Sequence, residues 1–406
     1  MAQQLSPMQI NQIARAAIKA RAVKRTQEIF NQTYSAPIPP TITVVPRNVG
    51  LIKGFWCKVT LTVDNGSGVN IEVTDFGAAN ALSQIQFNDL QNNTRIQTSG
   101  WHCHFVNSEK ARRPFGFQNC VSFEFNNPTG SVLPIDYNAE NSAAKMTGQI
   151  FADPDINAAA SGTVVMWYWI PLSYSDDDLR GAVYANVVNA TMQLNLSFPG
   201  TNGVKVAADN GTDSTLAIYA GVTAGSTALV AISQATVQVY QVYMDQLPTD
   251  PQLGVLLPVI DLATIYELKN TAQSAIVANT EFPYQYANFR DFLSTTMVYV
   301  NDGAAGTRAG GTDINYFSLQ AANFSNIWKK NPDLVGLETR NYCGVDFPPG
   351  VYYFGTREKP ISTVQYGNMQ LILNANTAAA GAYQLIGVED FALTQTLSMA
   401  GSLAAS

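Results

Sequence analysis

The sequence predicts an all-β fold, of the sandwich or jelly-roll kind, from three patterns of residues. Residues 58–63 alternate apolar and polar side chains before the turn-forming residues 64–66, and residues 192–198 alternate in the same way before Pro199-Gly200. Such alternation is typical of half-buried antiparallel strands. Residues 163–172 and 235–244 are rich in aromatic and β-branched side chains, which favour strands. Because helical patterns are few, the sequence gives little support to a parallel α/β sheet.

Residues 1–30 predict a basic amphipathic helix. Ser6-Pro7 reads as an N-cap followed by proline at the first helical position, and apolar residues between 10 and 18 follow helical spacing. Five basic residues against Glu28 give this segment a charge of +4, whereas the whole chain carries -7. We expect the helix to fray soon after Ile18, where cations enter its apolar face.

The positive charge of this arm suits an anionic membrane, most of all when many copies act together on one surface. Contact with nucleic acid and a merely solvated arm are the alternatives. The expected membrane-facing residues are the five cations, Arg15, Lys19, Arg21, Lys24 and Arg25.

Two proline-containing segments divide the chain. Residues 36–40 predict an extended linker into the body, and residues 245–251 contain two prolines among polar residues after a long strand. We therefore expect an arm at 1–30, a first unit at 31–247, a second unit at 248–395 and a flexible tail at 396–406. Each unit has the length of one jelly roll with insertions. Long loops are expected at 201–227 and 301–311, and short helices at 177–183 and 262–270.

The composition indicates a surface suited to contacts between subunits. Only 13% of the residues are charged, against about 25% in an ordinary soluble domain. Burying an amide or hydroxyl costs less than burying an ion, so a weakly charged exterior suits large interfaces. The four cysteines are scattered without a CxxC pair, which favours reduced thiols in a cytosol. No apolar stretch is long enough to be a secretory signal or to span a bilayer.

Trp101-His102-Cys103-His104 is the strongest candidate for metal chemistry. On a strand, His102 and His104 would project to one face, and with Glu109 they match most of the first motif of the cupins, metal-binding jelly-roll enzymes. The motif's first glycine is replaced by Ile96, and the chain has only two histidines, so the second cupin motif has no histidine ligand. Structural histidines are the preferred interpretation.

The remaining candidates have weaker support. Asp176-Asp177-Asp178 fits the start of a helix better than a calcium site. The glycine-rich residues 303–311 lack the Gly-Lys-Ser/Thr ending of a phosphate-binding loop. A sugar-binding jelly-roll lectin would need exposed aromatic side chains, for which Trp101 and Trp328 are the candidates.

Many stretches of the chain resemble the major capsid proteins of tectiviruses, double-stranded-DNA bacteriophages with a membrane beneath the shell. The matches run in one order nearly from end to end, whereas residues 201–227 and the tail from 397 to 406 depart from the family pattern. The resembling stretches are 74–80, 98–107, 169–175, 245–248, 257–262, 285–288, 311–316, 322–325, 350–353, 359–361 and 365–368.

The resemblance implies two tandem eight-stranded jelly rolls with a short N-terminal helix and a few helices inserted in loops. It implies a structural protein of the virion capsid, made and assembled in the cytoplasm of a bacterial host, and not an enzyme. It also implies a homotrimer that tiles with neighbouring trimers as a pseudo-hexamer, over an internal membrane that the N-terminal helix faces. Contacts with vertex, spike or cement proteins fit this role, whereas no cofactor, no metal and no sequence-specific nucleic-acid binding are expected.

Overall fold

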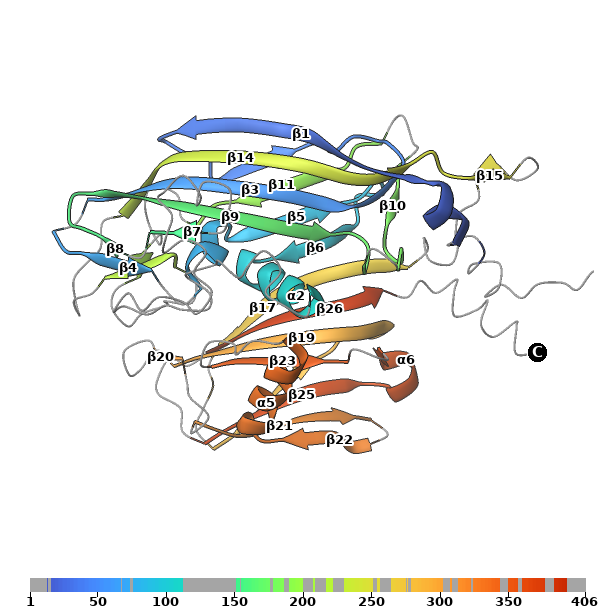
Figure 1. Cartoon of the computed structure of the whole chain (residues 1–406). Coiled ribbons are helices and arrows are strands. Elements are labelled where there is room, and N and C mark those ends of the chain that lie inside the picture. The colour runs from blue at the N-terminus through green and yellow to red at the C-terminus, as the bar shows by residue number, and fades with distance from the viewer. Residues whose placement is uncertain are drawn as a thin grey trace, which may run out of the picture.

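In the computed structural model, most of the described residues lie in strands (Figure 1). The residues that it describes are 13, 16–66, 68–73, 76–111, 151–153, 155–175, 178–185, 190–199, 207–208, 217–221, 230–250, 254–255, 264–274, 276, 279–301, 307–308, 313–322, 324–343, 350–356, 360–376 and 383–392.

The first jelly roll consists of two facing sheets. One has the order β1 (Val23–Ser35), β14 (Val230–Asp245), β3 (Leu51–Asn65), β9 (Ser161–Pro171) and β7 (Phe151–Ala152), with β10 (Val183–Tyr184) paired to β3. The other has the order β2 (Thr41–Val44), β11 (Gln193–Ser197), β5 (Gln84–Asn88) and β6 (Thr94–Thr98). The alternation read from the sequence decides which side chains lie between them: Val59, Leu61 and Val63 are fully buried, and the residues between them are half-exposed.

The second jelly roll repeats this strand order. Its first sheet contains β17 (Ile265–Ser274), β26 (Tyr383–Ala392), β19 (Arg290–Asn301) and β23 (Val351–Gly355), with β20 (Thr307–Arg308) and β24 (Ile361–Ser362) also paired to β19. Its second sheet has the order β18 (Glu281–Gln285), β25 (Met369–Ala375), β21 (Ile314–Ala321) and β22 (Phe324–Lys330). A separate apolar core lies between these two sheets.

The two rolls are joined through a shared sheet. β6 of the first roll pairs in parallel with β17 of the second, with Ile96 opposite Leu268 and Gln97 opposite Lys269. The β2-β11-β5-β6 sheet thereby continues into β17-β26-β19, and Figure 1 shows the second roll stacked beside the first. This pairing fixes the orientation of one roll relative to the other.

Helices and minor strands occupy the connections. Besides a short helix at residues 16–21, the described helices are α2 (Gly100–Ala111), α5 (Pro332–Cys343) and α6 (Thr363–Tyr366), with a 3₁₀ turn η1 (Gly77–Ala81). Minor strands are β4 (Ile71–Val73), β8 (Asp155–Ile156), β12 (Ala207–Ala208), β13 (Tyr219–Gly221), β15 (Thr249–Asp250) and β16 (Gly254–Val255). Among the helices that the structure describes, none combines the length and the apolar character needed to cross a membrane.

Three local predictions are wrong. The helix expected at 262–270 is a strand from Ile265 onward, because β17 pairs with β26 along its whole length and with β6 on its other side. The helix expected at 177–183 is a turn followed by β10, in the part of it that the structure describes. The strand expected at 101–104 is helical and belongs to α2. In the first case hydrogen bonding to distant strands outweighed the local helical spacing. In the second case local turn hydrogen bonds, such as that from Ala182 N to Leu179 O, take the place of a helix.

The N-terminal arm is shorter than expected. Residues 16–21 are helical, and β1 begins at Val23 and pairs with β14 as far as Ser35. Residues 23–30 therefore belong to the first roll, and the proline-rich residues 36–40 connect two of its strands. The expected tail at 396–406, and most of the loops expected at 201–227 and 301–311, lie outside the described residues.

Candidate functional site

The N-terminal helix is docked on the first roll through Ile18. This side chain is fully buried in a small cluster with Leu51, Leu179, Ala182 and Met244. Ile13, which was assigned to the same apolar stripe, is exposed. Ile18 therefore attaches the helix to the first roll and is not available to insert into a lipid bilayer.

The five cations assigned to a membrane-facing arm are divided between two elements. Lys19 and Arg21 are exposed on the helix at 16–21, whereas Lys24 and Arg25 are exposed on β1. Arg25 Nε lies 2.9 Å from Asp245 Oδ2, so this cation forms an ion pair across β1 and β14. Arg15 lies outside the described residues.

The two histidines lie on α2 and are both buried. Successive residues on a helix are about 100° apart, so His102 and His104 point in different directions, and the shared face expected of a strand does not exist. Burial lowers the pKa of His102 to about 4, partly opposed by the nearby Glu389, and lowers the pKa of His104 to about 3. Both imidazoles are therefore neutral at pH 7.

His102 and His104 belong to no metal-binding cluster among the described side chains. Glu109 lies on the same helix as the histidines. In the part of the chain that the structure describes, no three His, Cys, Asp or Glu side chains are grouped so that they could hold a metal ion. The cupin-like interpretation requires residues 101–104 to form a strand, and these residues are helical.

His102 joins the two rolls. Its Nδ1 is 2.6 Å from Thr98 Oγ1, and its ring rests against the backbone of Gly387 on β26. Nearby, Glu389 accepts hydrogen bonds from Tyr266 at 2.6 Å and from Ser294 at 2.8 Å. These buried contacts make the face of β17-β26-β19 an interior surface between the rolls.

The aromatic candidates for sugar binding are enclosed. Trp101 is 1% exposed and stacks on Phe76, with ring centroids 5.9 Å apart. Trp328 is half-buried and stacks on Phe354, with centroids 5.4 Å apart. Neither side chain offers an open aromatic platform.

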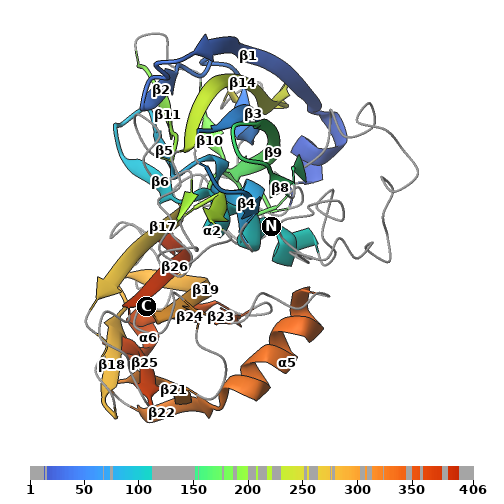
Figure 2. The same ribbon diagram turned by 90° about the vertical axis from the view of Figure 1, so that its left-hand side faces the viewer.

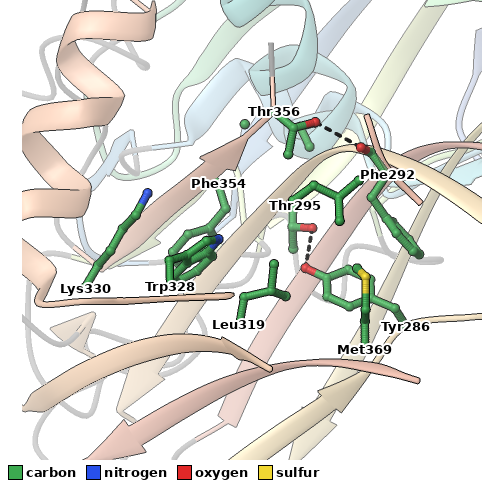
Figure 3. Close-up of a pocket in the computed structure, with 12 residues that line it drawn as sticks. Tyr286, Phe292, Thr295, Leu319, Trp328, Lys330, Phe354, Thr356 and Met369 are labelled. Atoms are coloured by element: carbon green, nitrogen blue, oxygen red, sulfur yellow. Dashed lines mark hydrogen bonds between the residues drawn. The ribbon is translucent and has the colours of Figure 1, made fainter. Parts of the chain in front are cut away.

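Trp328 and Phe354 line a small cavity inside the second roll (Figure 3). Its volume is about 40 Å³, room for about three water molecules, whereas ligand pockets measure roughly 300–1,000 Å³. Tyr286 and Thr295 share a hydrogen bond of 2.8 Å at its wall, and Lys330 is held by Glu338 at 2.6 Å. A cavity of this volume does not fit a sugar.

The outer face of β14-β3-β9 carries a group of aromatic side chains that sequence reasoning missed. Trp56, Trp167, Trp169 and Tyr240 are each half-buried, and the rings of Trp56 and Trp169 have centroids 5.0 Å apart. Lys58 lies 5.7 Å from the centroid of Trp167. The signal was in the aromatic run at 163–172, since alternation places Tyr168 inside and Trp167 and Trp169 outside.

Comparisons with known proteins point to a coat protein. The family described as "P3 major capsid protein N-terminal" matches residues 20–247, and "P3 major capsid protein C-terminal" matches residues 263–405. Major capsid protein P3 of Enterobacteria phage PRD1 is 38% identical over 397 residues, which cover 98% of this chain and 94% of that protein.

Solved structures share the fold at low sequence identity. The STIV MCP has a TM-score of 0.61 and 9% identity, and the match covers 93% of this chain and 99% of that chain. The Faustovirus major capsid protein has a TM-score of 0.52 and 8% identity, with 92% of this chain and 91% of that chain covered. These neighbours are double jelly-roll proteins, in agreement with the strand order described above.

Proposed function

Because this chain belongs to the P3 family of major capsid proteins, a family of bacteriophage coat proteins, we propose that it acts by self-assembly into trimers. In this proposal each trimer presents six jelly rolls in a near-hexagonal ring, and neighbouring trimers tile an icosahedral shell over an internal membrane. The function then depends on buried area and on geometry, and no side chain has to perform chemistry.

The observation that carries the trimer proposal is the way the two rolls repeat each other. Both rolls have the same strand order, and they lie side by side through the pairing of β6 with β17. Because one roll already contacts a second roll of like shape, the rolls of further copies can make the same contact until a ring closes. Three copies of a two-roll chain supply six such units.

The weakly charged surface supports the same proposal. With 13% charged residues, the flanks of the chain lose little ionic solvation when they are buried against a neighbour. An obligate interface of this kind buries more than about 1,600 Å² in total.

The arm supports the proposed contact with lipid. Lys19 and Arg21 are exposed on a helix that Ile18 anchors to the body, so their charges are held at a fixed place on each copy. Each cation near an anionic bilayer contributes about 1 kcal/mol, and many copies on one shell add their effects.

We keep the division into rolls as part of the proposal, with the arm ended before Val23. The first roll then extends to residue 247, the second covers 248–395, and the tail follows. Contacts of loops or tail with vertex, spike or cement proteins belong to the proposal as well.

Sedimentation of the purified full-length chain at micromolar concentration tests the trimer. We expect a single species with about three times the 43.9 kDa mass of the chain. Negative-stain images should then show particles of near-hexagonal outline. A species of 43.9 kDa that stays monomeric as the concentration is raised would contradict the proposal.

A further inference from the structure

The two rolls carry equivalent helices in equivalent places. α2 begins two residues after β6 ends, at Gly100, and α5 begins two residues after β22 ends, at Pro332; each has 12 residues. In both helices the fourth residue faces the core of its own roll: Cys103 in α2 and Val335 in α5 are fully buried. The two helices can therefore be compared position by position.

α2 has a second side, which contacts the other roll. The ring of His102, the third residue of α2, rests against Gly387 in the sheet β17-β26-β19-β23. Phe105, the sixth residue, is 1% exposed and packs on Phe76 and Trp101 of its own roll. Side chains on this face of the sheet belong to the same apolar core as the first roll, namely Leu268, Leu293, Val298, Val351 and Leu385. Within one chain, the helix of roll one thus covers the outer face of the sheet of roll two.

The equivalent side of α5 is exposed. Leu334 and Leu337 occupy the third and sixth positions, those of His102 and Phe105, and they are 42% and 65% exposed. Figure 2 shows α5 along the flank of the second roll, beside the sheet, with one end next to α2 of the first roll. Exposed leucines at helical spacing are typical of a docking face.

The equivalent sheet face of roll one is the aromatic face described above. β1-β14-β3-β9 has the same order as β17-β26-β19-β23, and its outer side carries Trp56, Trp167, Trp169 and Tyr240. Half-exposed aromatic side chains are enriched where proteins bind each other. Charged side chains accompany both apolar surfaces: Asp333 and Arg340 are exposed on α5, and Lys58 and Glu28 lie beside Trp167 and Tyr240. Each surface therefore offers both signs of charge to the other.

We propose that α5 of one copy docks on the β1-β14-β3-β9 face of the next copy, and thereby repeats between chains the contact that α2 makes within the chain. Leu334 and Leu337 then pack on Trp56, Trp167 and Trp169. The contact is head-to-tail, since it joins two different surfaces of the same chain, and it can close into a ring. This inference rests on the proposed trimer and names the surfaces that hold it together.

Substitution of an exposed leucine tests the contact without disturbing a core. Leu337→Asp should raise the protein concentration at which half of the chains are assembled at least tenfold. The reason is that docking would strip the hydration water from the introduced carboxylate. The matched control is Val364→Asp on α6, which is 54% exposed and lies outside the proposed contact, and it should assemble like the wild type. Circular dichroism spectra and unfolding curves of the monomers check that both variants are folded.

The outcomes separate this inference from the trimer itself. A wild-type chain that never forms trimers would overturn the proposed function. A wild-type trimer that Leu337→Asp leaves intact, with the same concentration dependence, would overturn only the role of α5.

Disulfide cross-linking tests which surface α5 meets. The double variant Leu337→Cys with Lys58→Cys should form a covalent trimer under mild oxidation, because every contact of a head-to-tail ring contains one residue of each kind. Neither single variant should form a dimer through its new cysteine. If Leu337→Cys alone becomes cross-linked, two α5 helices meet about a twofold axis and the inference is wrong. A trimer in which the double variant stays unlinked would also contradict it.

Discussion

The imidazole ring of His102 lies directly against the main chain of Gly387. A β-carbon built at Gly387 would lie 2.2 Å from His102 Cδ2 and 2.5 Å from Cγ and Nε2, closer than any two such atoms can approach. Glycine is therefore required at position 387, because the His102 ring of the first roll occupies the space that a side chain on β26 of the second roll would need. The contact links the helix of the first roll to the central strand β26 of the second.

Gly387→Ala should destabilise the chain. The histidine ring is enclosed and cannot move aside without disturbing Thr98, so the added methyl group should cost about 1–3 kcal/mol of unfolding free energy. Urea denaturation at a fixed protein concentration measures this loss. Gly68→Ala is the matched control, because a β-carbon at Gly68 has no atom within 4 Å, and its midpoint should stay within experimental error of the wild type. Equal midpoints for both variants would show that the close approach has no energetic weight.

Acid should destabilise the fold through the two histidines. Burial lowers the pKa of His102 to about 4 and of His104 to about 3, from an ordinary value of 6.5. Below pH 6.5 the unfolded chain binds protons that the folded chain does not, so the unfolding free energy falls with falling pH until the folded pKa is reached. The slope approaches about 1.4 kcal/mol per pH unit for each histidine.

Urea midpoints at pH 7, 6 and 5 check this dependence. His104→Gln should lower stability at pH 7 and should have a flatter pH profile than the wild type. A variant profile that runs parallel to that of the wild type would exclude His104 as the group responsible.

Asp390 should act in the opposite direction. Burial raises its pKa to about 7; Glu267 and Glu389 add to this rise, and Arg290 and Lys269 oppose it. Above an ordinary carboxyl pKa of 3.8 the unfolded chain loses a proton that the folded chain retains, so Asp390 weakens the fold as the pH rises towards 7. The charged or titratable groups around it are Glu267 and Lys269 on β17, Tyr284 on β18, Arg290 on β19 and Glu389 on β26.

Asp390→Asn should therefore gain stability relative to the wild type at pH 8 and gain less at pH 5. Thermal unfolding at the two pH values measures the difference. Asp291→Asn, on the neighbouring β19, serves as a control for loss of one acidic charge in the same sheet. If both variants respond alike, the effect comes from net charge and not from the buried site.

Charge reversal on the arm should weaken binding to anionic vesicles. Lys19→Glu with Arg21→Glu leaves Ile18 in its cluster and should cost at least about 2 kcal/mol, roughly thirtyfold in affinity, because two favourable cations are lost. Co-sedimentation with phosphatidylglycerol-containing vesicles measures the binding. Arg47→Glu with Lys329→Glu makes the same change in net charge at exposed positions elsewhere and should bind like the wild type. Equal losses in both double variants would remove the specific role of the arm.

The sequence predicted most strands correctly, because the information for them is local. Alternation in β3 and β11 and the aromatic run in β9 each describe which face of a strand is buried, whatever the strand pairs with. The errors occur where partners distant in the chain decide the structure. Residues 265–270 carry helical spacing but complete a sheet, and Lys24 and Arg25 continue a basic arm in sequence but belong to β1.

What the sequence determined by itself is the class of the fold, the arm's positive charge and the scarcity of charge elsewhere, all of which follow from composition and short-range patterns. Only the tertiary structure decided that Ile18 is docked, that His102 fills the space above Gly387 and that Leu337 is exposed while Phe105 is buried. The physical reason is that burial depends on which surfaces meet. The two equivalent helices differ because one side of α2 is covered by the sheet of the other roll, whereas the same side of α5 lies on the surface of the chain.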